Sequence, residues 1–268
     1  MIRSISLLKY ASAEERMFFL LRFGILGCFV GHGAWGLIGK ESWLTFFNVF
    51  YFPESISRIA MPIVGLMDIT VGVVLFFAPT RRWLWWAAIW TIFTALLRPS
   101  AGMGMSEFFE RAGNYGVPLA MLFLTASIQP RLQFAGAIHF QDIQWEKYHL
   151  GFERILRWSL FLLLAGHGGL AFFNEHPVIT KHLDFIGWGA SRSNIMIFGA
   201  FEMLLALVVL LRPRIAGLMV FVLFYKLVTE SLHPIAGHSR DVFETIERMG
   251  DYVIPLILIA YYAHFPKR

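Results

Sequence analysis

Two histidines, each followed in the next apolar segment by an acidic residue, are the side chains in this sequence best suited to chemistry. His32 precedes Asp68 and His167 precedes Glu202, and all four lie within apolar segments. An imidazole can exchange a proton, donate a hydrogen bond to a ligand carbonyl or ligate haem iron. Three roles therefore stay open for the two histidines: packing against a carboxylate of a neighbouring helix, contact with a quinone or other substrate, and axial ligation of one b-type haem.

A second group of ionisable residues lies inside apolar segments and requires partners there. A charged side chain at the centre of a bilayer costs about 2.5–3.5 kcal/mol, so such residues normally turn inward and pair. Lys226 and Glu230 are one helical turn apart and can form an ion pair on one helix face. That pair either fixes helix packing or, together with Glu202, relays protons or substrate.

The composition is that of a membrane protein. Of 268 residues, 57% are hydrophobic and 15% are charged, whereas soluble domains average about 25% charged, and the mean hydropathy is +0.60. A helix of about 20 mainly apolar residues crosses a bilayer. We therefore predict an all-α integral membrane protein with eight transmembrane helices in these apolar runs: 18–38, 60–79, 83–97, 115–128, 155–173, 193–211, 214–232 and 252–265.

The distribution of basic residues predicts an orientation. With the spans as above, one side of the membrane carries 14 Lys and Arg residues and the other carries eight. Positive charge marks the cytoplasmic side, so both termini are expected in the cytoplasm, and the chain is expected in a bacterial inner membrane.

Two classes of function are disfavoured by the same composition. The basic residues lie at the ends of apolar runs rather than in one stripe, so no nucleic-acid partner is expected. Cys28 is the single cysteine, which makes cysteine redox catalysis within the chain improbable.

The two halves of the sequence repeat each other at a nearly constant spacing. Gly31-His32-Gly33 recurs as Gly166-His167-Gly168, Gly65-x-x-Asp68 recurs as Gly199-x-x-Glu202, and Glu110-Arg111 recurs as Glu247-Arg248. We predict two four-helix repeats, 1–128 and 154–268, joined by a cytoplasmic linker, 129–153. Because each repeat has an even number of spans, the two are expected to be oriented in parallel.

When the polar residues are placed on the predicted spans, they fall in one layer near the outer surface of the membrane. We expect an outward-facing polar pocket there. Candidates for proton transfer are Glu202, His233 and Lys226. Candidates for contact with a substrate or cofactor are His167, His32, Asp68, Arg98, Glu247, Arg248, Asp251 and Tyr252.

The halves differ, and charged residues are concentrated in the second. Lys226, Glu230 and His233 align mostly with neutral positions of the first half, apart from Arg98 opposite His233, so chemistry is expected mainly in the second half. The sequence from His233 to Glu244 contains several metal-ligand types, but its spacing matches no template and is more typical of a helix cap, so no metal site is predicted.

These motifs resemble those of the DoxX-like family of small four-span membrane proteins. In the first half the resemblance rests on Gly31-His32-Gly33, Gly36, Lys40, Gly65-x-x-Asp68, Gly72 and Pro79-Thr80-Arg81. In the second half it rests on Gly199-x-x-Glu202, His233, Gly250-Asp251-Tyr252 and Pro255. The chain departs from the family pattern at Asp68, where the family has glutamate, and at Arg98, where it has histidine; the second half also lacks the downstream lysine.

The resemblance implies a membrane redox role, since some DoxX-like relatives are small subunits of thiosulfate:quinone oxidoreductase or of other membrane redox assemblies. The first hypothesis is a quinone-interacting or accessory subunit of such a system, with a redox partner protein, in which Glu202 and His233 exchange protons with a quinone near His167. A carrier for a small molecule or protons is the second hypothesis, and a structural partner without catalysis is the third. Whether the chain is itself an enzyme stays open, and among cofactors quinone is favoured over b-type haem.

Overall fold

The computed structural model describes residues 11–126, 135–215 and 217–265, and these residues form a nearly all-helical protein. The predicted all-α class is confirmed. In the first half the helices are α2 (Ala13–Ile38), α3 (Leu44–Asn48), α4 (Glu54–Phe77), α5 (Arg81–Ser100), α6 (Met105–Glu110) and α7 (Ala112–Leu124). In the second half they are α9 (Trp145–Phe172), α10 (Pro177–Phe185), α11 (Arg192–Leu211), α12 (Leu218–Ala236), α13 (Val242–Glu247) and α14 (Met249–His264).

Local signals in the sequence explain where the long helices begin and end. The Ser12 hydroxyl accepts a hydrogen bond from the backbone N–H of Glu15 at 3.1 Å, which caps the first turn of α2. Ser191 caps α11 in the same way through Asn194 at 3.2 Å. Gly39 ends α2 with φ of 79°, a left-handed conformation that favours glycine.

Within the described residues, five helices are long and apolar enough to cross a membrane: α2, α4, α9, α11 and α12. The eight spans predicted from the sequence are therefore supported only in part. The predicted fourth and eighth spans correspond to α7 and α14, which contain 13 and 16 residues, and each of these helices follows a short helix, α6 or α13, after a break at a Glu-Arg pair. Residues 145–153 of the predicted linker are helical, because α9 begins at Trp145; residues 127–134 lie outside the described residues.

The helix pairs α2–α4 and α9–α11 pack with their backbones in close contact. A β-carbon on Gly33 would lie 2.6 Å from the carbonyl oxygen of Gly65, and one on Gly168 would lie 2.7 Å from that of Gly199. Only glycine permits this approach. It brings the histidine that precedes each glycine next to the acidic residue of the neighbouring helix.

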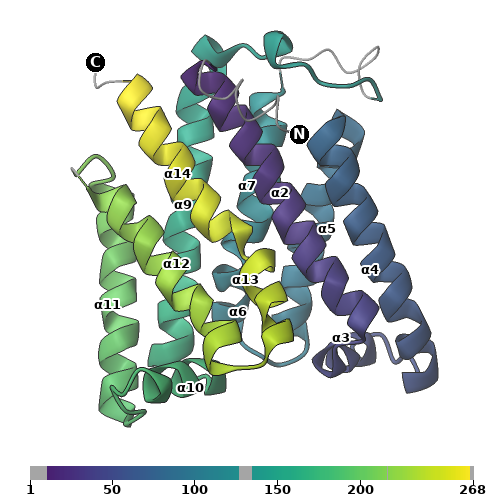
Figure 1. The fold of residues 1–268 in the computed structure, drawn as a ribbon, viewed down its shortest axis with the longest axis vertical. Helices are drawn as coiled ribbons and strands as arrows, with labels where there is room; N and C mark the ends of the chain where they lie inside the picture. The colour runs from purple at the N-terminus through teal and green to yellow at the C-terminus, as the bar shows by residue number, and fades with distance from the viewer. Residues whose placement is uncertain (1–10, 127–134, 216, 266–268) are drawn as a thin grey trace.

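The two halves interlock rather than lie side by side. Helix α2 packs against α13 and α14 of the second half, and α9 packs against α6 and α7 of the first half. Figure 1 shows the start of α2 and the end of α14 at one end of the bundle, with the short helices α3 and α10 at the opposite end. Helices α6 and α13 carry Glu110 and Glu247. In the view of Figure 1 they lie between α11 and α12 on one side and α4 and α5 on the other.

Candidate functional site

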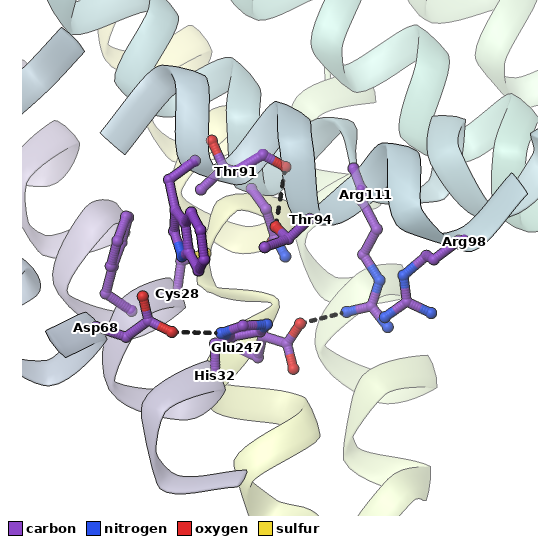
Figure 2. Close-up of a pocket in the computed structure, with 12 residues that line it drawn as sticks. Cys28, His32, Asp68, Thr91, Thr94, Arg98, Arg111 and Glu247 are labelled. Atoms are coloured by element: carbon purple, nitrogen blue, oxygen red, sulfur yellow. Dashed lines mark hydrogen bonds and ion pairs between the residues drawn. The ribbon is translucent and has the colours of Figure 1, made fainter. Parts of the chain in front are cut away.

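The first histidine pairs with the acidic residue of its own half. His32 on α2 lies with its Nδ1 atom 2.6 Å from Oδ2 of Asp68 on α4 (Figure 2). The Asp68 side chain is fully buried, whereas His32 is 22% exposed. The imidazole also packs on Trp43, with ring centroids 4.5 Å apart. His32 is thus oriented by a carboxylate on one edge while part of its ring remains accessible.

The second histidine is held in the same way, with one more partner. Nδ1 of His167 on α9 lies 2.5 Å from Oε2 of the fully buried Glu202 on α11. The hydroxyl of Tyr225 on α12 donates to the other oxygen, Oε1, at 2.8 Å. Of the three roles left open for the histidines, the structure shows contact with a carboxylate of a neighbouring helix.

Each histidine borders its own apolar cavity. The cavity beside His32 has a volume of about 330 Å³ and is lined by the aromatic residues Trp43, Phe46, Phe47, Phe50, Phe52, Trp90 and Phe93. The cavity beside His167 has a volume of about 350 Å³, and its lining includes Ile179, His182, Trp188, Phe198 and Phe201. These separate surroundings do not favour one haem shared by the two histidines.

Between the halves lies a third, polar cavity of about 450 Å³. Its charged lining is mixed in sign: Lys40, Arg98, Glu107, Glu110, Arg111, Asp241, Glu244 and Arg248. His167 borders both this cavity and the apolar cavity of the second half. Of the residues expected in the polar pocket, Arg98, His167, His233 and Arg248 line this cavity.

The repeated Glu-Arg dipeptides exchange partners across the two halves. Arg111 contacts Glu247 at 2.7 Å, and Arg248 contacts Glu110 at 2.9 Å. All four side chains are buried. Figure 2 shows the Arg111–Glu247 contact beside the His32–Asp68 pair. This reciprocal pairing joins the halves by charge at the level of the histidines.

The charges in this network control one another's protonation. Burial alone would raise the pKa of Glu110, but the guanidinium groups of Arg111, Arg248 and Arg98 outweigh it and hold that pKa far below its usual range. Burial of Arg111 opposes its charge, yet the surrounding carboxylates raise its pKa. The network is therefore ionised at neutral pH.

The predicted ion pair of Lys226 and Glu230 is present and fully buried. The Lys226 ammonium also lies 3.1 Å from Oδ2 of Asp251. His233 contacts Glu230 at 3.3 Å, and its ring packs on His182 with centroids 4.9 Å apart. These residues form a compact charged cluster in the second half.

The remaining candidates lie at the edges of these groups. Arg98 contacts Glu107 at 2.9 Å, and the Tyr252 hydroxyl donates to the backbone carbonyl of Thr245 at 3.2 Å. The sequence-predicted residues thus divide among two histidine–carboxylate pairs, the inter-half network and the Lys226 cluster. His167, His233 and Arg248 line the cavity of about 450 Å³ together, and Glu202 contacts His167, so the quinone site predicted around His167 stays a prediction.

Sequence reasoning missed three residues that line these cavities or contact the paired carboxylates: Glu107, Trp90 and Tyr225. The spacing from Glu107 to Glu244 is the same as that between the two Glu-Arg dipeptides. The spacing from Trp90 to Tyr225 is the same as that from His32 to His167. Extending the repeat alignment by a few positions identifies all three.

Comparison with known proteins gives one family. A family model described as the DoxX-like family matches residues 27–109, the segment that contains His32 and Asp68. No curated protein and no solved structure matches the chain. The match does not reach the second half, so the tandem duplication stays a prediction. Residues 27–109 of the chain are thus similar to the DoxX-like family.

Proposed function

We propose that this DoxX-like membrane protein binds a quinone as an accessory subunit of a membrane redox system. The observation that carries the proposal is a partly accessible imidazole, tied to a buried carboxylate, at the edge of an aromatic-lined cavity. His32 with Asp68 supplies this arrangement in the first half, and His167 with Glu202 supplies it in the second.

Both chemistry and size fit a quinone head group. With Nδ1 of His32 engaged by Asp68, Nε2 is the ring nitrogen left to meet a ligand, and it donates to a ligand carbonyl when the imidazole is protonated. A flat ring packs well among aromatic side chains, and 330 Å³ lies within the range of about 300–1,000 Å³ common for small-molecule pockets. The histidine–carboxylate pair then holds a proton close to the oxygen that gains charge when the ring is reduced.

Two further features belong to the same proposal. Two parallel four-helix repeats, with both termini in the cytoplasm of a bacterium, would place both histidines toward the outer leaflet. The packing between the halves supports the part of this proposal that concerns two equivalent repeats, because α2 packs against α13 and α14 in the same way as α9 packs against α6 and α7.

The test is quinone binding to the detergent-purified full chain. We expect quinone to be extracted with the protein, and decylubiquinone to bind the purified chain and lose at least tenfold in affinity in a His32→Ala, His167→Ala double variant. His149→Ala is the matched control, since His149 bonds instead to the hydroxyl of Tyr261. Absence of quinone in the extract together with no binding of decylubiquinone refutes the proposal. A Soret band in the purified protein would point instead to haem.

The polar cavity favours a second candidate function, transport. This cavity has a volume of about 450 Å³ and is lined by charged residues of both signs. The side chains of Glu202, Lys226 and Glu230 are buried within the helical bundle. Proton-dependent uptake into liposomes containing the purified chain would support a carrier, and unchanged uptake in Glu202→Gln liposomes would argue against it. Normal function after neutralising each polar residue in turn would indicate a structural partner.

A further inference from the structure

The two histidine–carboxylate pairs differ in how completely the carboxylate is bonded. In the second half both oxygens of Glu202 have partners, His167 on Oε2 and the Tyr225 hydroxyl on Oε1. In the first half Asp68 is fully buried and Oδ2 contacts His32, but Oδ1 has no hydrogen-bond partner among the described residues. A buried carboxylate oxygen without a partner costs free energy unless something donates to it.

The residue that could donate to Asp68 differs between the halves as well. Trp90 occupies the position that corresponds to Tyr225, at the same spacing that relates His32 to His167. Its indole N–H is also buried and has no acceptor among the described residues. Aspartate is one methylene shorter than glutamate, and an indole N–H is fixed in the ring plane, so this pair does not close the contact that Glu202 and Tyr225 make. One acceptor and one donor are left beside His32.

Both groups border the same small cavity, which Arg98, Arg111 and Glu247 also line. Thr91, Ala95 and Asn114 line it in the first half. The corresponding second-half positions are Lys226, Glu230 and Asp251, whose charged side chains pair with one another. The smaller neutral residues leave about 30 Å³ next to His32, enough for a group the size of one water molecule.

This small cavity lies beside the aromatic cavity of the first half. His32, Trp90 and Thr94 line both. A ring among Phe46, Phe47 and Phe93 can therefore place one substituent near Asp68 and Trp90.

We infer that the first-half cavity binds an aromatic ligand through a hydroxyl group, which donates to Oδ1 of Asp68 and accepts from the indole N–H of Trp90. A carbonyl or ether oxygen can accept from Trp90 but gives Asp68 no hydrogen. This inference rests on the proposed function, from which it takes a quinone-like ring as the ligand. It assigns the reduced form of that ring, which carries hydroxyl groups, to the first half. The second half, with Glu202 already satisfied, has no preference for a hydroxyl.

The test compares two probes that differ only in the hydrogen. We would measure binding of 4-hexylphenol and its methyl ether, 4-hexylanisole, to the detergent-purified full chain by equilibrium dialysis. We expect the phenol to bind at least tenfold more tightly, because the ether leaves Asp68 unpartnered, and Trp90→Phe to weaken phenol binding about fivefold to tenfold. Equal binding of the two probes overturns the inference, since water alone would then bridge Asp68 and Trp90.

A transplant variant separates a specific contact from general disruption. Asp68→Glu with Trp90→Tyr installs the residues of the second half and should abolish the preference for phenol. Trp145→Phe is the control, because it also removes a buried indole N–H without an acceptor among the described residues but lines neither first-half cavity, and it should leave that preference intact. Retained preference in the transplant variant overturns the inference. The outcome is distinct from that of the quinone assay: phenol selectivity without any quinone binding refutes the proposed function alone, whereas quinone binding without phenol selectivity refutes only this inference.

Discussion

Removing Arg111 should destabilise the protein more than removing Arg248, even though Arg248 contacts more carboxylates. Arg111 contacts two of them and Arg248 contacts three. A count of ion pairs therefore predicts the opposite order. The order depends on whether a carboxylate loses its last cationic partner. A buried charge without a partner lowers the free energy of unfolding far more than the weakening of an ion pair does.

The partners of each carboxylate settle this order. Glu247 has Arg111 as its one ion-pair partner among the described residues. The carboxylates that contact Arg248 each have a second cation: Glu110 has Arg111, Glu244 has Lys40, and Glu230 has Lys226. Arg111→Gln thus strands Glu247, which is 4% exposed, whereas Arg248→Gln strands no carboxylate.

Removing one partner of a buried ion pair typically costs about 3–5 kcal/mol. We expect a loss of that size for Arg111→Gln and about 1–2 kcal/mol for Arg248→Gln. For a chain of this length each kcal/mol lowers the melting temperature by about 2–4 °C. The expected falls are therefore roughly 6–20 °C and roughly 2–8 °C.

Thermal unfolding of the detergent-purified variants at pH 7 measures the difference. Arg58→Gln is the control, because its ion pairs with Glu41 and Glu54 are exposed, and it should change the unfolding free energy by less than about 1 kcal/mol. Adding Glu247→Gln to Arg111→Gln should recover part of the loss, since it removes the stranded charge. Equal destabilisation by the two arginine variants, or no recovery in the double variant, would refute the reasoning.

Three further predictions concern other parts of the bundle. Lys226→Met should destabilise the chain by about 3–5 kcal/mol because it removes the one ion-pair partner that Asp251 has among the described residues, and adding Asp251→Asn should restore part of that loss in thermal melts. Gly31→Ala should lower the melting temperature far more than Gly24→Ala, since its β-carbon would overlap the backbone of α13, whereas that of Gly24 would meet valine side chains at 3.2 Å; similar melts would contradict this. Burial, with a contribution from a neighbouring histidine, lowers the pKa of His182 from its usual 6.5 to about 4, so the unfolded state takes up the proton first and stability falls as pH drops from about 6.5 to 4. Allowing for solvent screening, the loss is about 1–2 kcal/mol, and His182→Phe should flatten the profile of melting temperature against pH.

The sequence predicts the helical class and most of the polar candidates, because apolar runs and isolated charges within them are strong local signals. It also predicts that Lys226 meets Glu230, since a spacing of one helical turn determines that contact within one helix. It does not predict that Arg111 meets Glu247, because that contact depends on how the helices of one half pack against those of the other. Nor does it reveal the breaks before α7 and α14, where the helix is interrupted at a buried arginine.

The expected concentration of chemistry in the second half follows from counting charges, and the structure shows why that count is a weak guide. The extra charged residues there, Lys226, Glu230 and Asp251, form ion pairs with one another. Their side chains occupy the positions at which smaller neutral residues line a cavity in the first half. The first half has neutral residues at those positions, and it is there that Asp68 and Trp90 keep unused hydrogen-bonding atoms beside a cavity. A ligand gains more from groups that lack partners than from groups already satisfied within the protein, because satisfied groups must first give up a bond. On this physical ground the half that departs from the family pattern at Asp68 is the better place to look for a bound molecule.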